Sequence, residues 1–158
     1  MAVLHNESRT LRLALQLADR VTLGPPRVLG SAGVECLDRR DGEFWPLVLL
    51  PVVYFAPGDL PELVASIRSL CALTSPGFGF RSDGEGDLAL QISRQEGAMN
   101  VEAGFDLARV LAETAGRPGV PGKELALFRF QTNTAELVQF ADQVRRELGE
   151  LRPSGSVR

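Results

Sequence analysis

The sequence lacks several features that would place it in a specific functional class. Its 158 residues include only two cysteines, Cys36 and Cys71, which lie far apart and form neither a CxxC nor a Cys/His ligand pattern. A disulfide framework or a zinc site is therefore not indicated, and we expect both thiols to be reduced and to pack as small apolar groups. A domain of this length buries enough core to need no covalent or metal staple.

The chain has one histidine, His5, which lies in the polar segment MAVLHNESRT. A histidine that acts as a base must be held within hydrogen-bonding distance of a nucleophile. We expect this segment to be mobile, and we therefore predict no catalytic role for His5. The rest of the sequence also marks no catalytic residue, no metal ligand and no cofactor-binding residue.

A surplus of basic charge and a long apolar run are missing as well. The net charge of −3 and the aromatic content of 6% disfavour nucleic acid, which attracts basic surfaces and stacks on aromatic side chains. The N-terminal segment is too polar for a signal peptide. The most apolar run, residues 46–57, is shorter than the roughly 20 residues of a membrane helix. We expect a cytoplasmic protein with no nucleic-acid or membrane partner.

What the sequence does contain is alternating and helical hydrophobic patterns. Leucine occupies every second position from Leu11 to Leu17, which favours a strand over residues 10–18. The helix-forming composition of this segment leaves a helix as the alternative. Residues 27–38 indicate a second strand, interrupted by glycines.

An Asp-Gly turn signal in residues 38–44 predicts a hairpin that leads into the run FWPLVLLPVVYFA. This run is apolar at nearly every position and predicts a strand buried on both faces. Pro46 and Pro51 imply an edge, a bulge or a break in this strand. Trp45 is the single candidate for a partner-binding residue, although most aromatic residues of such a strand belong to the core.

Residues 60–73 predict a helix, with Asp59 as the N-cap and Glu62 completing a capping box. Four further strands follow after Pro76. A helical turn over residues 108–114 and a Gly/Pro-rich loop over residues 116–123 precede the last of these strands. The chain closes with a helix that is capped by Asn133 or Thr134, with Glu136 placed for a capping box with Asn133 and a single apolar stripe along the helix.

Two stretches imitate ligand-binding motifs. Asp83, Glu85 and Asp87 alternate like the first ligands of a calcium loop, but the required glycine and glutamate are replaced by Leu88 and Arg94. We therefore predict a solvated turn.

The glycines of residues 77–80 follow a helix and precede a strand, as C-cap glycines do and phosphate-binding loops do not. The charged residues of the last helix indicate a solvated face, with part of a protein-binding surface as the alternative; they are Arg145, Arg146, Glu147 and Glu150.

Together these patterns predict a single α+β domain over residues 1–151, followed by a disordered tail over residues 152–158. The domain would contain a largely antiparallel sheet of about six to seven strands, one internal helix and one C-terminal helix.

Three segments carry a family resemblance: LALQLAD, GDLPELVASIRSL and FRFQTNTAELVQFADQVRREL. With the order of its elements, the chain resembles the small α+β proteins grouped with the WapI-type immunity proteins of bacterial contact-dependent toxin systems. The resemblance implies a non-catalytic protein that neutralises a toxin, or the product of a neighbouring gene, by occluding it, and it implies no cofactor. The alternatives are a structural or adaptor subunit of a secretion or phage-like assembly, and a small-ligand binder or enzyme with a site not visible in the sequence.

Overall fold

The computed structural model describes residues 1–22, 24–83, 87–106 and 125–151. The predicted helical turn over residues 108–114, the loop over residues 116–123 and the tail over residues 152–158 lie outside the described residues. In the described part of the chain, no helix is both long and apolar enough to cross a membrane.

The described residues form eight strands and two helices, and the predicted α+β class with antiparallel pairing is confirmed. The strands are β1 (Ala2–His5), β2 (Leu11–Val21), β3 (Arg27–Leu37), β4 (Phe44–Phe55), β5 (Gly77–Arg81), β6 (Leu88–Gln95), β7 (Ala98–Asp106) and β8 (Leu125–Thr132). The helices are α1 (Asp59–Cys71) and α3 (Thr134–Glu150). Where one sheet of about six to seven strands was expected, there are two four-stranded sheets: sheet A, ordered β1-β2-β3-β4, and sheet B, ordered β5-β6-β7-β8.

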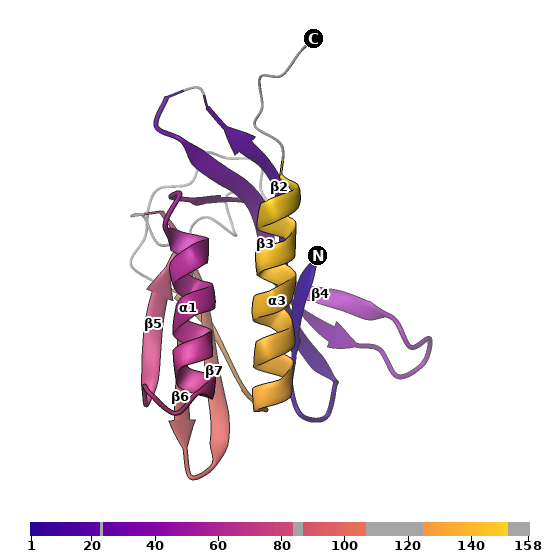
Figure 1. Cartoon of the computed structure of the whole chain (residues 1–158). Helices are drawn as coiled ribbons and strands as arrows, with labels where there is room; N and C mark the ends of the chain where they lie inside the picture. The colour runs from indigo at the N-terminus through magenta and orange to yellow at the C-terminus, as the bar shows by residue number, and fades with distance from the viewer. Residues whose placement is uncertain (23, 84–86, 107–124, 152–158) are drawn as a thin grey trace.

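Among the described residues, the two halves of the chain follow the same order, in which four strands form a meander and a helix follows. The helices are exchanged between the sheets: α1 follows sheet A but lies beside β5, and α3 follows sheet B but lies beside β1 (Figure 1). The two helices also pack against each other. The order of elements is therefore repeated, although the amino-acid sequence gives no sign of a repeat.

Strand β2 shows why an alternating pattern gives a strand here. Leu13, Leu15 and Leu17 are buried in the core, Gln16 is exposed, and the small Ala14 on the opposite face is 8% exposed. Burial with a period of two is the pattern of a strand with one face on a core. The strand prediction for this segment is confirmed, and the helical alternative is wrong.

One continuous hydrophobic core fills the space between the sheets and the helices. Its largest fully buried side chains include Phe55 from sheet A, Phe105 from sheet B and Phe140 from α3. Phe55 also stacks on Phe80 of β5, with ring centres 6.4 Å apart. The sheets are therefore joined by side-chain packing rather than by a shared strand.

The N-terminus of α1 differs from the prediction. Gly58 is the N-cap residue and makes no side-chain cap. The Asp59 carboxylate instead accepts hydrogen bonds from the backbone N–H groups of Ala56, at 2.8 Å, and Asp83, at 2.9 Å. The predicted capping box at Asp59 is wrong, because the carboxylate joins the helix start to the end of β5.

A substitution at Gly33 tests how closely β3 and β4 approach each other. A Cβ atom at Gly33 would lie 2.6 Å from the carbonyl oxygen of Val48, so Gly33→Ala must push the two strands apart. We expect a loss of about 1–3 kcal/mol in the free energy of unfolding, measured by urea denaturation.

The matched control for Gly33→Ala is Gly149→Ala in the last turn of α3, where nothing lies within 4 Å of the added Cβ. This variant should be neutral or more stable by up to about 1 kcal/mol, because alanine favours the helix. Equal stability of Gly33→Ala and the unmodified protein would contradict the strand spacing.

Candidate functional site

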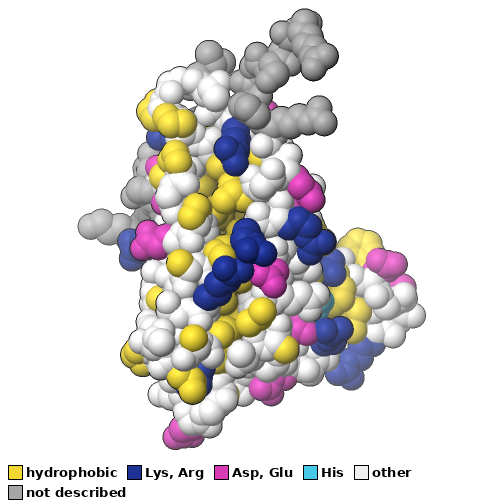
Figure 2. All heavy atoms as spheres, viewed as in Figure 1, with side chains coloured by type: hydrophobic (Ala, Val, Ile, Leu, Met, Phe, Trp, Pro, Cys, Tyr) yellow, Lys and Arg dark blue, Asp and Glu magenta, His cyan; other side chains and the backbone are white. Residues whose placement is uncertain are grey.

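The most exposed apolar surface lies on β4, a strand predicted to be buried on both faces. Trp45, Leu47 and Leu49 are 58%, 55% and 51% exposed, whereas Val48 and Leu50 belong to the core. The prediction is therefore wrong for one side of the strand. We call the three exposed residues the β4 strip. Figure 2 shows hydrophobic side chains on the projecting β3–β4 hairpin, with basic and acidic side chains beside them.

The β4 strip follows the open edge of sheet A. Among the described residues, β4 pairs with β3 alone. Trp45 pairs with Cys36 and Leu49 pairs with Gly33, and a register shift lies between the two pairs. The strip residues therefore share an edge strand, but they do not form one strictly alternating face.

Two exposed prolines lie on this edge strand. Pro46 borders the first register shift, and Pro51 lies within a second shift between the paired residues Leu50 and Val53. The predicted edge and bulge are both confirmed. Proline has no N–H to donate, and bulges distort the edge, so both features discourage pairing with a strand from another molecule. Contacts made by β4 are expected to use its side chains.

The start of β4 is fixed by the Phe44 ring. The guanidinium carbon of Arg12 lies 4.0 Å from the centre of this ring, and the His5 ring lies edge-on to it at 5.9 Å. Arg12 also forms an ion pair with Glu35 at 2.5 Å. Trp45 thus projects from a segment whose neighbouring side chain, Phe44, is contacted by side chains of β1 and β2.

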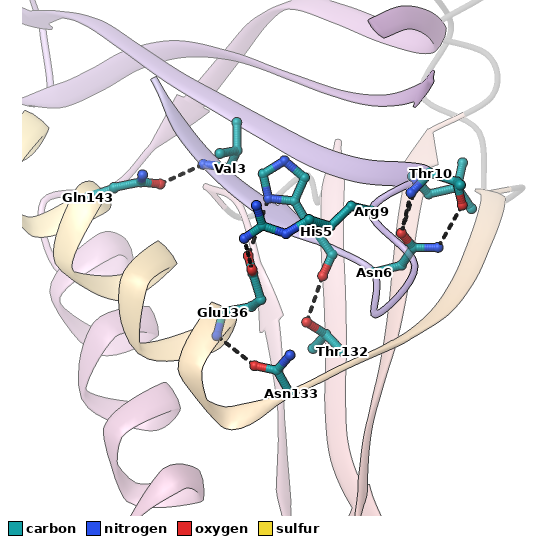
Figure 3. A network of polar contacts seen from close by, with 10 residues as sticks. Val3, His5, Asn6, Arg9, Thr10, Thr132, Asn133, Glu136 and Gln143 are labelled. Carbon is teal, nitrogen blue, oxygen red and sulfur yellow. Dashed lines mark hydrogen bonds and ion pairs between the residues drawn. The ribbon is translucent and has the colours of Figure 1, made fainter. Parts of the chain in front are cut away.

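His5 lies on a strand, and the expectation of a mobile segment is wrong because β1 pairs with β2. Figure 3 shows the contacts that hold it. Its Nδ1 lies 3.2 Å from one oxygen of Glu136, and Arg9 donates to the other oxygen at 2.5 Å. Within the described residues, Glu136 is the hydrogen-bond partner of the His5 ring. The contact joins two structural elements and assembles no base–nucleophile pair.

Glu136 is only 8% exposed, and one of the two hydrogen bonds of the predicted capping box is present. Asn133 caps α3 by accepting a hydrogen bond from the Glu136 backbone N–H at 2.9 Å, as predicted. The Glu136 carboxylate turns away to Arg9 and His5, so the reciprocal half is wrong. Burial raises the pKa of this carboxyl group, but the hydrogen bonds and charges of Arg9 and His5 outweigh burial, and the net pKa is lowered.

Helix α3 covers the other edge of sheet A. The Gln143 side chain accepts a hydrogen bond from the Val3 backbone N–H at 2.8 Å, and Glu147 accepts one from the Leu17 backbone N–H at 3.0 Å. Glu147 is therefore not part of a solvated face, whereas Arg145, Arg146 and Glu150 are exposed as predicted. Of the two edges of sheet A, β1 is covered by α3, whereas no described strand pairs with the outer edge of β4.

Sheet B has a different outer face, which is hollowed and lined by both polar and apolar residues. Two adjoining hollows of about 530 and 400 Å³ share Gln91 and Glu102 as lining residues. Glu102 forms an ion pair with Arg129 across β7 and β8. The remaining polar lining residues are Arg81, Ser93, Gln95, Asn100 and Gln131. Such a surface offers many hydrogen-bonding groups to a ligand or a partner.

Asp83 and Asp87 of the acidic turn are less exposed than the predicted solvated turn implies. Asp83 is half-buried and pairs with Arg27 at 2.7 Å, and Asp87 is 9% exposed. Glu85 lies outside the described residues. In the part of the chain that the structure describes, no group of three or more His, Cys, Asp or Glu side chains is arranged to hold a metal ion.

The two cysteines are free, as predicted, but they are half-buried rather than fully packed in the core. Burial raises the pKa of the Cys71 thiol, and the charge of Arg94 offsets part of this effect. The glycines of residues 77–80 lie within β5 rather than at a helix end, because α1 ends at Cys71, with Ala72 as its C-cap, and Leu73 takes the left-handed conformation with φ of 63°. The predicted C-cap role of these glycines is wrong.

The Glu136 network should make stability depend on pH. Because folding lowers this pKa, the charged carboxylate stabilises the fold above the pKa of the unfolded chain, and the stabilisation is lost as the pH falls through the lower pKa of the folded state. At pH 7, Glu136→Gln should lower the free energy of unfolding by about 1–3 kcal/mol. The difference from the unmodified protein should shrink as the pH falls below the ordinary pKa of a glutamate, about 4.5, and through the lower pKa of the folded state.

Glu102→Gln is the matched control, because it breaks a pair in which Arg129 is 73% exposed. This change should cost less than about 1 kcal/mol. If urea denaturation gave Glu136→Gln an equally small cost, or one that does not vary with pH, the proposed contribution of the network would be wrong.

Comparisons with known proteins add no family assignment: no family model matches the chain, and neither the curated proteins nor the solved structures contain a match.

Proposed function

We propose that the protein is a non-catalytic protein-binding module that binds its partner through the β4 strip. The observation that carries this proposal is the exposure of Trp45, Leu47 and Leu49 to more than half on a single edge strand. A cluster of exposed large apolar side chains is typical of a protein interface. Tryptophan is also among the residues that contribute most to binding energy.

The form of the edge supports recognition by side chains. Pro46 and Pro51 disfavour the addition of a strand to β4, so the partner would have to accept protruding side chains. The Phe44 contacts with Arg12 and His5 fix the backbone from which Trp45 projects. A pre-organised anchor of this kind loses little conformational entropy on binding.

The partner we propose is a cognate bacterial toxin, and the protein would act as its cytoplasmic immunity protein. This step rests on the resemblance of the three quoted segments to WapI-type immunity proteins. Occlusion of a toxin requires a rigid surface but no catalytic residues. A strand that packs against the core provides such a surface. The net charge of −3 would favour a basic partner only weakly.

A second candidate function is the binding of a small polar ligand by sheet B. The two adjoining hollows support it, because about 530 and 400 Å³ fall within the range of ligand sites. Their open, amide-rich lining is less typical of such sites than an enclosed apolar pocket is. We therefore place this candidate second.

The test is co-expression with the product of the neighbouring gene, followed by purification of the complex and a growth-protection assay. We expect a stable complex and protection from the toxin. Trp45→Ala should weaken the complex by at least about tenfold and reduce protection. Since Trp45 is the single tryptophan of the chain, a blue shift of its fluorescence in complex with a tryptophan-free partner variant would report its burial directly.

Leu127→Ala is the control, because Leu127 is 49% exposed but belongs to sheet B. It should bind and protect like the unmodified protein. The proposal fails if no neighbouring product forms a complex, or if Trp45→Ala and Leu127→Ala bind equally well.

A further inference from the structure

A hollow of about 350 Å³ lies where the turn end of the β2–β3 hairpin meets the start of α1 and the end of α3 (Figure 1). We call it the β2–β3 hollow. Its apolar lining residues are Val21, Pro26, Val28, Pro57, Pro61 and Leu148. Small-molecule sites have volumes of about 300–1,000 Å³ and linings that are mostly apolar with a few polar groups. The β2–β3 hollow meets both conditions.

The polar part of the hollow is basic. The remaining described lining residues are Arg20, Thr22 and Arg27, and none of the described lining residues is an aspartate or a glutamate. A guanidinium group is planar, and its N–H groups form a fork that matches the two oxygens of a carboxylate. The β2–β3 hollow thus combines apolar walls with positive charge of the kind that binds carboxylates.

Both arginines are held in place by other parts of the fold. A terminal nitrogen of Arg20 donates a hydrogen bond to the carbonyl oxygen of Leu148 at 2.9 Å. Because Leu148 itself lines the hollow, this bond keeps the guanidinium beside it. Arg27 pairs through Nε with Asp83 at 2.7 Å, and its guanidinium carbon lies 5.6 Å from the centre of the Tyr54 ring. A guanidinium has five N–H donors, so an arginine that is held by one partner can bind a second one.

The apolar walls of the hollow are rigid as well. Pro26 precedes β3, Pro57 precedes α1, and Pro61 lies in the first turn of α1. The ring of a proline fixes the φ angle of its residue. Val28 is only 5% exposed and belongs to the core. A site that is already formed loses little conformational entropy when a ligand binds.

We propose that the β2–β3 hollow binds a small monocarboxylate with an aliphatic or aromatic body, with the carboxylate at Arg20 and Arg27 and the body against the prolines. The charges favour a monoanion. Arg20 and Arg27 carry two positive charges and Asp83 carries one negative charge, so the three side chains leave one positive charge. One carboxylate balances this charge, whereas the second negative charge of a phosphate dianion would have no partner among these residues.

The β2–β3 hollow is separate from the β4 strip. Trp45 lies near the start of β4, whereas Tyr54, which contacts Arg27, lies near its end. A strand rises about 3.3 Å per residue, so the two side chains are on the order of 30 Å apart. A small carboxylate in the hollow would therefore touch neither Trp45 nor a partner bound to it. Carboxylate binding and the proposed function are thus independent, and either can fail without the other.

The experiment is a titration of the purified full chain with phenylacetate and with hexanoate, followed by calorimetry and by the backbone amide signals in ¹H–¹⁵N spectra. We expect dissociation constants of about 1 mM or lower, since ligands of this size bind weakly. Phenylacetamide, which lacks the charge, and acetate, which lacks the apolar body, should each bind at least about tenfold more weakly than phenylacetate, and so should inorganic phosphate. The largest signal changes should fall on Val21, Arg27, Val28 and Leu148.

Two substitutions test the charge and the space separately. Arg20→Gln removes the charge but keeps an amide donor, and it should weaken phenylacetate binding by at least about tenfold, to the affinity of phenylacetamide for the unmodified chain. Val21→Phe fills the hollow and should weaken the binding of both carboxylates by at least about tenfold. Arg129→Gln and Val138→Phe are the matched controls, because Arg129 is 73% exposed on sheet B and Val138 is 41% exposed on α3, both outside the lining. Both controls should bind like the unmodified chain, and circular dichroism should show all four variants folded.

No binding of either carboxylate at about 10 mM overturns the proposal. So does phosphate that binds more tightly than phenylacetate, and so do signal changes centred on Gln91 and Glu102, which would place the ligand on sheet B. The proposal is also wrong if Arg20→Gln and Val21→Phe both bind phenylacetate like the unmodified chain. If one of these two variants is unfolded, the other variant and the ligand series still decide the outcome. Since no partner is present in the titration, its result and that of the co-expression test are read separately.

Discussion

The attachment of α3 to β1 determines which edge of sheet A is covered by the rest of the described chain. Gln143 and Glu147 accept hydrogen bonds from the backbone of β1 and β2, and the buried Glu136 pairs with Arg9 and His5. These contacts join the last helix to the first strands, and they satisfy backbone donors that an exposed edge would leave to water. With β1 closed in this way, sheet A can meet another molecule through β4 or through its outer face.

The repeated order of four strands and a helix gives two sheets with the same topology and different surfaces. Sheet A has a small-residue centre and an apolar edge, whereas sheet B has amide side chains around the Glu102–Arg129 pair. The common topology supplies the frame, and the outward residues differ because the core places no demand on them. Any function specific to this chain must therefore depend on the outward residues rather than on the fold.

Much of the fold follows from local patterns, whereas the partners of individual side chains do not. The period of two in β2 and the capping asparagine of α3 were sufficient to predict both elements. Asp59 and Glu136 also had the spacing of capping residues, but each binds groups that are distant in sequence. Only the folded arrangement brings Asp83 and Arg9 to them. The division into two sheets has the same origin, since alternation identifies strands but does not choose their neighbours.

The β4 segment shows most clearly what the sequence alone could not predict, namely which of its apolar side chains are exposed. An apolar run predicts burial, and only the prolines within it signalled that one side would remain open. The same prolines reconcile two opposing requirements. An exposed apolar edge strand normally invites aggregation, yet an interface needs exposed apolar side chains. By removing backbone donors while leaving Trp45, Leu47 and Leu49 in place, the sequence keeps an apolar side-chain surface and suppresses strand pairing, and this combination supports the proposed protein-binding role.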